Sequence, residues 1–223
     1  MTRAKIFTNT LYQLGAKIVS TFSSLFITVI LTRSLGSEVW GNYAIVVTYI
    51  TFFYIFTEFG VNSIAVKYFS EKVHICKNDF ISFLITRFLF TVTTILSALF
   101  LLFLFNYPKQ IVDSILFLFI SLLFFSLGSS FNAIYQAKLL YKNLFIATLF
   151  SSAVNIAVFL IIFGVNKAPN FLMLFIPIVV AEICRFLISA FLAKKHVIKC
   201  EKYVFNKKLV LYFIKASIPL GLA

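Results

Sequence analysis

The sequence predicts an all-α integral membrane protein, built as a lobe of six transmembrane helices followed by the start of a seventh helix. Of its 223 residues, 61% are hydrophobic and only 12% are charged, whereas a soluble domain is about half apolar and a quarter charged. Its 30 Phe residues against one Trp and two Met are typical of side chains that face lipid. The apolar residues also gather into stretches of the length that a bilayer requires, about 20 residues per helix.

Six apolar stretches are long enough to cross the hydrocarbon core as helices. The connections between them, such as "TRSLGSEVWGN" after the first and "NYPKQ" after the third, are polar, and several contain Gly, Pro or Asn, which mark turns. In chain order the predicted spans are Thr8–Leu31, Tyr43–Ala65, Phe80–Phe105, Ile111–Gln136, Asn143–Phe163 and Phe171–Ala193.

The chain continues beyond the sixth span with a basic segment and a further apolar stretch, residues 209–223. These last residues reach only about 22 Å as a helix, less than the roughly 30 Å thickness of the hydrocarbon core. A natural protein rarely ends within the membrane. We therefore expect residues 1–193 to be the N-terminal lobe of a longer transporter or of a truncated form. Residues 194–208 would be a cytoplasmic linker, and residues 209–223 would begin the seventh transmembrane helix of a second lobe.

Basic residues outside the predicted spans alternate along the chain. The connections after the first, third and fifth spans hold one each, namely Arg33, Lys109 and Lys167. The N-terminus and the connections after the even-numbered spans hold the others: Arg3, Lys5, Lys67, Lys72, Lys77, Lys138, Lys142, Lys194, Lys195, Lys199, Lys202, Lys207 and Lys208. Because cytoplasmic loops are enriched in Lys and Arg, the N-terminus is predicted to be cytoplasmic. The net charge of +13 then reflects topology, and we expect no nucleic-acid partner.

Five ionisable residues interrupt the predicted spans: Lys17, Glu58, Arg87, Glu182 and Arg185. Each costs at least about 2.5–3.5 kcal/mol at the bilayer centre. At 1.5 Å per residue they lie about 10–16 Å from the cytoplasmic ends of their spans, so all five fall in one slab. In a structural interpretation, Glu58 pairs with Lys17 or Arg87, and Glu182 pairs with Arg185 one helical turn away.

A functional interpretation places the same residues around a water-filled cavity that opens to the cytoplasm. Its three cations would outnumber its two carboxylates and suit an anionic head group, and Lys17 would serve as a point charge for a phosphate. Uncharged polar residues recur at helical spacing on the same spans, although packing between helices also accounts for their hydroxyls. The candidate substrate-binding residues are Lys17, Arg87, Arg185, Gln13, Asn62 and Asn155, and the candidate structural ion-pair residues are Glu58 and Glu182.

The sequence holds no recognisable catalytic or metal-binding pattern. His74 and His196 lie in predicted connections without a second ligand at suitable spacing. The cysteines, Cys76, Cys184 and Cys200, also lack metal-ligand spacing. Nucleotide-binding and hydrolase motifs do not occur. We therefore expect no enzyme activity, no cofactor and no bound metal.

Two segments carry a family resemblance. The segment "ILTRSLGSEVWGNYAIVVTY", through Arg33, Gly36 and Gly41, and the segment "TEFGVNSIAVKYFS", through Glu58 and Gly60, resemble the polysaccharide flippases of the multidrug/oligosaccharidyl-lipid/polysaccharide exporter superfamily. The C-terminal "KKLVLYFIKASIPLGLA" resembles the start of their seventh helix.

This resemblance implies an exporter of twelve to fourteen helices, with two six-helix lobes around a central cavity. Such exporters move undecaprenyl-pyrophosphate-linked oligosaccharides across the bacterial inner membrane for O-antigen, teichoic acid or capsule synthesis. Basic cavity residues would engage the pyrophosphate, and Lys17 lies where the first helix faces that cavity. Arg33, Gly36 and Gly41 would shape a periplasmic turn. Membrane lipid, a glycan polymerase and chain-length machinery are the further partners that the resemblance implies.

Three other functions are compatible with parts of the sequence. A drug or cation antiporter of the same superfamily would need a net acidic cavity, whereas the candidate cavity here is net basic. A membrane polymerase or ligase for the same glycan would need large periplasmic loops, and the predicted loops are short. A non-transporting membrane scaffold is the third alternative.

The alternation of basic residues generates a topology prediction. Reporter fusions or cysteine accessibility should place Lys72 and Lys199 in the cytoplasm, and Lys109 and Lys167 outside it. The opposite sidedness at two or more of these positions would overturn the predicted spans.

Overall fold

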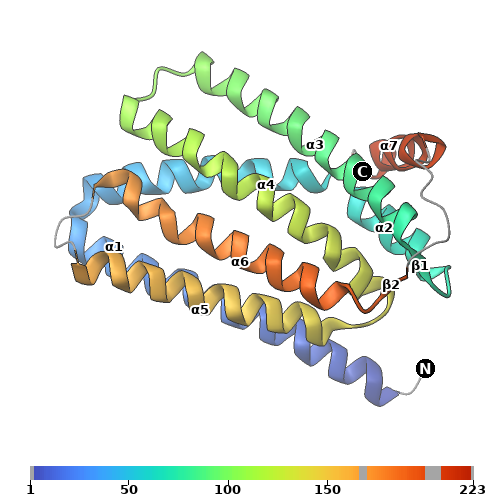
Figure 1. Ribbon diagram of the computed structural model, residues 1–223. Helices are drawn as coiled ribbons and strands as arrows, with labels where there is room; N and C mark the ends of the chain where they lie inside the picture. The colour runs from blue at the N-terminus through green and yellow to red at the C-terminus, as the bar shows by residue number, and fades with distance from the viewer. Residues whose placement is uncertain (1–2, 166–169, 199–206, 222–223) are drawn as a thin grey trace.

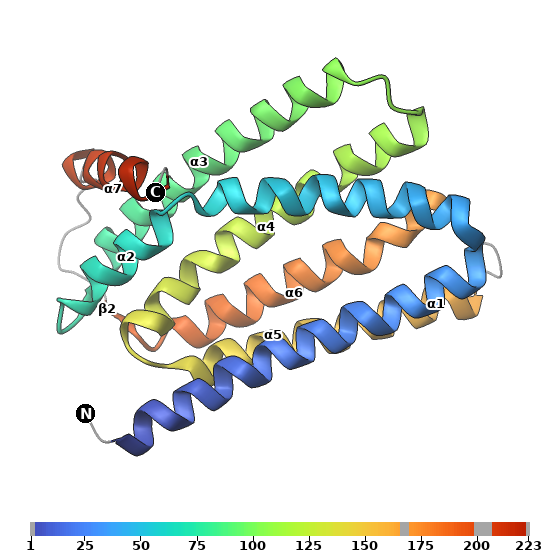
Figure 2. The ribbon, with the colours of Figure 1, turned by 180° about the vertical axis from the view of Figure 1, so that it is seen from behind.

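The computed structural model describes residues 3–165, 170–198 and 207–221, and in it the chain is almost entirely helical (Figure 1). The long helices lie side by side in one elongated bundle, and short turns join them at its two ends (Figures 1 and 2). The elements in chain order are α1 (Arg3–Glu58), α2 (Val61–Ser70), β1 (Ile75–Cys76), α3 (Lys77–Leu104), α4 (Lys109–Ala137), α5 (Tyr141–Val165), the 3-10 helix η1 (Phe171–Phe175), α6 (Ile176–Ala193), β2 (Val197–Ile198) and α7 (Lys207–Gly221).

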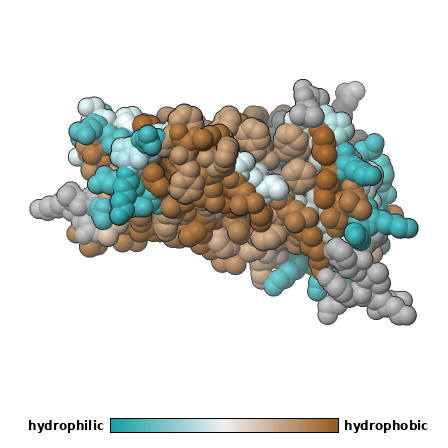
Figure 3. All heavy atoms as spheres, turned by 90° about the horizontal axis from the view of Figure 1, so that it is seen from above, coloured by the Kyte–Doolittle hydropathy of each residue, from teal (hydrophilic) through white to brown (hydrophobic). Residues whose placement is uncertain are grey.

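The exterior of the bundle is that of a multi-pass membrane protein. Within the described residues, five helical stretches are long and apolar enough to cross a membrane: Phe7–Ser70, Lys77–Leu104, Lys109–Ala137, Tyr141–Val165 and Phe171–Ala193. Large apolar side chains such as Phe22, Phe100 and Phe191 are two-thirds or more exposed. Apolar atoms cover the middle of the molecule and polar residues gather at both ends (Figure 3), as expected when lipid surrounds the middle.

A single glycine divides α1 into two arms. Gly36 has φ 78° and ψ 173°, a conformation that glycine adopts without the clash of a Cβ atom. The chain therefore reverses direction at Gly36, and the second arm, residues 37–58, runs back from the end of the first arm, residues 3–35 (Figure 2). The predicted connection "TRSLGSEVWGN" is thus wrong as a loop, because it is helical on both sides of Gly36. The five stretches count α1 once, and the six spans plus a seventh remain a prediction.

A second glycine interrupts the predicted span Tyr43–Ala65. α1 ends at Glu58, and Gly60 has φ 72° before α2 begins. A Cβ atom on Gly60 would lie 2.9 Å from both the Leu220 Cβ atom and the Ser217 carbonyl oxygen of α7. The absence of a side chain therefore permits both the left-handed backbone and the close approach of α7.

The remaining helices begin and end within a few residues of their predicted bounds. The exception is the sixth, where η1 precedes α6 and Pro177 occupies the first turn of α6, a position that tolerates a missing N–H group. α7 covers the stretch predicted to begin the seventh span and packs against α2 and α3. Most of the predicted linker, with Lys199, Cys200 and Lys202, lies outside the described residues, as does Lys167.

Three connections meet at one end of the bundle. β1 pairs in parallel with β2, Ile75 opposite Val197, and the Lys138 ammonium donates to the carbonyl oxygens of Lys72 and Val73. These are the connections that follow α2, α4 and α6 and that carry the predicted cytoplasmic lysines. Lys72 also pairs with Asp79. Burial lowers the pKa of Lys72, but hydrogen bonds with Asp79 and Tyr68 outweigh this effect and raise it.

The interior contains two apolar clusters with a polar layer between them. One cluster lies toward the Gly36 end and includes Leu31, Val46 and Phe175. The other lies toward the paired connections and includes Val61, Phe69 and Phe213. Along α3 and α4, hydroxyls occupy the positions between the clusters, where Thr91 and Ser126 are hydrogen-bonded at 2.5 Å. Mutual bonding of this kind satisfies polar groups that lipid and apolar side chains cannot.

Alanine substitutions at the two turn glycines, Gly36 and Gly60, and at the helical Gly41 form a matched series for the free energy of unfolding. Gly36→Ala should cost about 1–3 kcal/mol, because φ 78° with ψ 173° is a backbone region that essentially only glycine adopts, although no atom lies in the way of a Cβ. Gly60→Ala should cost more, since its Cβ atom would also displace α7. Gly41→Ala should be neutral or slightly stabilising, because Gly41 is helical and open. Thermal unfolding of the purified protein in detergent measures all three, and equal losses in Gly36→Ala and Gly60→Ala would contradict the role of the α7 contact.

Candidate functional site

Two of the candidate cations meet at a cavity of about 350 Å³, which we call the basic cavity. Lys17 reaches it from α1 and Arg185 reaches it from α6. Gln13, Lys17 and Ser20 line the cavity together because residues three and four apart share one face of a helix. The other polar lining residues, from α4 and α5, are Asn132, Gln136, Tyr141 and Thr148.

Lys17 is an exposed cation without a carboxylate partner. The ion pairs among the described residues are Lys72–Asp79 and Arg185–Glu182, so none involves Lys17. Ser20 donates to the backbone carbonyl oxygen of Lys17 at 3.0 Å, and no ion pair among the described residues involves the Lys17 ammonium group. An unpaired ammonium group in an apolar span is costly unless it meets water or an anion. The basic cavity leaves space of about 350 Å³ beside Lys17, enough to hold water or an anion.

Arg185 is partly neutralised within its own helix. Its Nη2 atom lies 2.5 Å from the Glu182 Oε2 atom, and its guanidinium lies 4.7 Å from the centre of the Phe125 ring. Phe125 in turn stacks on Tyr54, which is hydrogen-bonded to Ser121. These contacts fix one edge of Arg185 while the residue still lines the cavity. The cavity therefore has one cation in excess, Lys17.

Arg87 lies apart from both Lys17 and Arg185. It is fully buried, and it donates to the Thr57 carbonyl oxygen at 3.0 Å and to the Asn62 Oδ1 atom at 3.5 Å. Arg87 and Asn62 thus contact each other and do not line the basic cavity, so the substrate-binding role expected for them stays a prediction. The five ionisable residues were expected to share a cavity because they lie at similar depths in the membrane. Depth alone does not specify the direction in which each side chain points.

The expected ion pair of Glu58 with Lys17 or Arg87 is absent from the described part of the chain. Glu58 is close enough to Arg87 for electrostatic attraction, but their charged atoms are not within 4 Å. The physical reason is the break at Gly60. It ends α1 and leaves carbonyl groups such as that of Thr57 without an intrahelical partner. Arg87 bonds to that carbonyl group instead of to the carboxylate.

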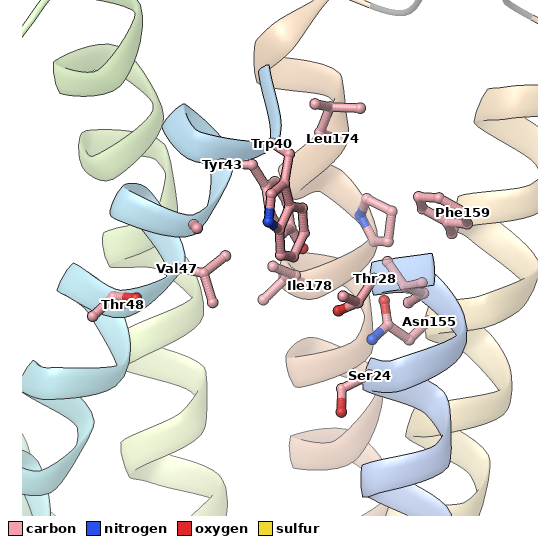
Figure 4. Close-up of a pocket in the computed structure, with 13 residues that line it drawn as sticks. Ser24, Thr28, Trp40, Tyr43, Val47, Thr48, Asn155, Phe159, Leu174 and Ile178 are labelled. Carbon is pink, nitrogen blue, oxygen red and sulfur yellow. The ribbon is translucent and has the colours of Figure 1, made fainter. Parts of the chain in front are cut away.

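A second cavity, of about 320 Å³, lies nearer the Gly36 end, and we call it the Trp40 cavity (Figure 4). Trp40 and Tyr43 of the second arm of α1 lie on one side, and Ser24, Thr28 and Asn155 lie on the other (Figure 4). Tyr43 is held between Trp40 and Phe175, with ring centres 5.6 Å and 5.1 Å apart. Among the residues that line it, none is charged.

The two cavities follow the same helix faces. On α1 the polar residues run from Gln13 and Lys17 in the basic cavity to Ser24 and Thr28 in the Trp40 cavity. On α5 they run from Thr148 to Asn155, two turns apart. Of the six candidate substrate-binding residues, Gln13, Lys17 and Arg185 share the basic cavity, Asn155 lines the Trp40 cavity, and Arg87 and Asn62 line neither.

The sequence-based candidates omitted the aromatic residues of both cavities. Trp40 and Tyr43 form a wall of the Trp40 cavity, and Phe125 lies against Arg185. Because the chain has 30 Phe and ten Tyr residues, the sequence alone does not distinguish the few aromatic residues that line cavities. The one available signal was Trp40, because it is the sole Trp of the chain and adjoins a turn at a predicted membrane surface, where Trp is enriched.

Comparison with known proteins gives one result. A family model described as "Polysaccharide biosynthesis protein" matches residues 6–223. No curated protein and no solved structure gives a significant match to the chain.

The contacts of Arg87 generate a comparison of two neighbouring substitutions. Asn62→Leu should lower stability by about 1–3 kcal/mol, because it removes an acceptor from a buried guanidinium. Glu58→Gln should cost less, since no hydrogen bond or ion pair to Arg87 is lost. Thermal unfolding and the yield of folded protein measure both. A greater loss in Glu58→Gln would mean that the carboxylate, and not the amide, is the partner of Arg87.

Proposed function

Because the family model matches nearly the whole chain, the chain belongs to the polysaccharide biosynthesis protein family, and from this premise we propose that it translocates a lipid-linked oligosaccharide. It is a multi-pass membrane protein with a role in polysaccharide biosynthesis. The proposed substrate is an undecaprenyl-pyrophosphate-linked oligosaccharide. The proposed location is the bacterial inner membrane, with the N-terminus in the cytoplasm.

The unpaired Lys17 in the basic cavity carries this proposal. A pyrophosphate group is a compact anion that must cross an apolar barrier, so its carrier needs a cation within the membrane. Lys17 supplies an ammonium group with no carboxylate bound to it, and charge-assisted contacts of this kind are stronger than neutral hydrogen bonds. Arg185, from another helix, adds a second cation at the same cavity.

Neutral polar residues complete the environment that an anionic head group requires. The side chains of Gln13, Asn132 and Gln136 carry amide N–H donors, and that of Tyr141 carries an O–H donor. They come from α1, α4 and α5, so a head group bound there would be contacted from several helices. Such a site would recognise phosphate oxygens through many moderate contacts and release them when the helices shift.

The excess positive charge also separates this proposal from export of cationic drugs. A cation would be repelled by Lys17, no carboxylate among the described residues lines the cavity, and Glu182 is bound to Arg185. We further propose that the chain moves its substrate and performs no bond chemistry on it. A glycan polymerase and chain-length machinery would then act on the glycan after translocation.

Substitution of Lys17 tests the proposal in the organism that carries the gene, in the protein as the cell makes it. Lys17→Arg should retain much of the surface polysaccharide, because the charge is kept. Lys17→Gln should lose most of it, because a charge-assisted contact is worth about 1.5–3 kcal/mol, roughly a ten- to hundredfold loss in substrate affinity. The measurement is surface polysaccharide normalised to the amount of the protein in the membrane.

The control is Lys67→Gln, which removes an exposed lysine of α2 that lines neither cavity. It should leave normalised polysaccharide unchanged. Full normalised activity in Lys17→Gln would reject the role of Lys17 in substrate binding. A fall in protein level with unchanged activity per molecule would assign Lys17 to stability alone.

A further inference from the structure

We infer that the Trp40 cavity is a subsite for one neutral pyranose ring of the glycan. The inference rests on the proposed function for the identity of the larger ligand. The cavity itself stands on four observations: an aromatic wall, an opposing polar wall with an unsatisfied amide, the absence of charge from its lining, and its position relative to Lys17.

The aromatic wall is rigidly held. Tyr43 is buried and lies between Trp40 and Phe175 with interplanar angles of 27° and 13°. The indole of Trp40, at the end of this stack, lines the open space (Figure 4). An indole presents a broad apolar face with a polar N–H edge. The C–H face of a pyranose is the complementary surface, because it is apolar while the rim of the same ring is polar.

The opposing wall holds an amide oxygen without a partner. The Oδ1 atom of Asn155 is buried and accepts no hydrogen bond. An unsatisfied polar atom of this kind costs about 1–3 kcal/mol, and in native structures it marks a place where water or a ligand completes the bonding. Asn155 lines the cavity, but this oxygen has no accessible surface as it lies, so the amide would rotate to accept from a sugar hydroxyl. The Thr28 hydroxyl also lines the cavity and offers a bond to a neighbouring sugar hydroxyl.

The uncharged lining selects against ionic groups. The basic cavity is lined by Lys17 and Arg185, whereas the lining of the Trp40 cavity contains no charged residue. Burying an anion or a cation there would leave it uncompensated. The cavity therefore suits a ligand that is neutral, polar at its rim and apolar on its faces. A volume of about 320 Å³ is at the small end of ligand pockets, which fits one sugar unit better than a long chain.

The position of the cavity fits a ligand that also binds Lys17. Ser24 and Thr28 follow Lys17 by seven and eleven residues on one face of the first arm of α1, so they lie about 10–17 Å farther along the helix axis. A glycan attached to a pyrophosphate at Lys17 would extend along this face toward the Gly36 end. The Trp40 cavity would then receive a sugar beyond the one attached to the phosphate.

Fluorescence of Trp40 gives a direct test, because it is the only Trp in the chain. The purified chain is held in a detergent without a sugar head group, since alkyl glycosides would compete for the cavity. The probes are glucose, galactose, rhamnose, N-acetylglucosamine and N-acetylgalactosamine. Sorbitol serves as the acyclic control and glucuronate as the charged control. At least one neutral pyranose should change the emission saturably at about millimolar concentration, and both controls should not.

Two substitutions locate the response. Asn155→Leu should weaken the binding of the responding sugar at least tenfold, and Thr28→Val, which is nearly isosteric, should weaken it about threefold. Lys67→Gln should leave the titration unchanged, because Lys67 lines neither cavity. If Asn155→Leu does not yield folded protein, Thr28→Val carries the test.

The absence of a saturable change with every pyranose would overturn the inference, as would an equal change with sorbitol or unweakened binding in the folded Asn155→Leu and Thr28→Val variants. A change caused by alkyl chains, and not by sugars, would assign the cavity to lipid and overturn it as well. These outcomes are distinguishable from failure of the proposed function, because that proposal is tested by the surface polysaccharide of the Lys17 variants. Loss of polysaccharide in Lys17→Gln with no sugar response would remove the subsite and leave translocation supported.

Discussion

The break between α1 and α2 exposes backbone carbonyl groups inside an apolar bundle, and the packing of the neighbouring helices follows from how those groups are satisfied. In lipid an unsatisfied backbone group has no water to bond with. Arg87 of α3 supplies a donor to the Thr57 carbonyl group, and Asn62 at the start of α2 accepts from the same guanidinium. One fully buried side chain thus joins α1, α2 and α3. Gly60, at the break, then lies close enough for α7 to pack directly against it.

The polar groups of the bundle divide into those that are bonded to one another and those that are not. Thr91 with Ser126, Tyr54 with Ser121, and Glu182 with Arg185 are paired between or within helices. Such pairs hold helices together in lipid, with modest energies for each bond. The ammonium group of Lys17 and the Oδ1 atom of Asn155 lack hydrogen-bonding and ionic partners in the described part of the chain, and both residues line cavities. Unpaired polar groups at cavities are the features that packing alone does not explain.

The sequence predicted the apolar helices well, because the bilayer imposes their length. Its errors arose where one residue decided the geometry. Gly36 replaces a whole predicted loop with a sharp turn, and Gly60 ends a helix that the apolar pattern would have continued. The similar depths of the charged residues predicted an ion pair of Glu58 with Lys17 or Arg87. That prediction did not account for the backbone carbonyl groups that a helix end exposes. The cavity at Lys17 could be anticipated from polar periodicity, whereas the Trp40 cavity could not, since its aromatic wall depends on the turn at Gly36.

The parallel pairing of β1 and β2 bears on the order in which the chain assembles. Ile75 lies opposite Val197, so roughly half of the chain separates the two partners. The backbone of β1 therefore emerges from the ribosome long before its partner exists, and water at the membrane surface must satisfy it in the meantime. The helices α3 to α6 lie between the two strands in the sequence and are synthesised before β2 is available to pair with β1. The joining of these strands is thus a late event in assembly, and it ties the first third of the chain to the end of the sixth helix.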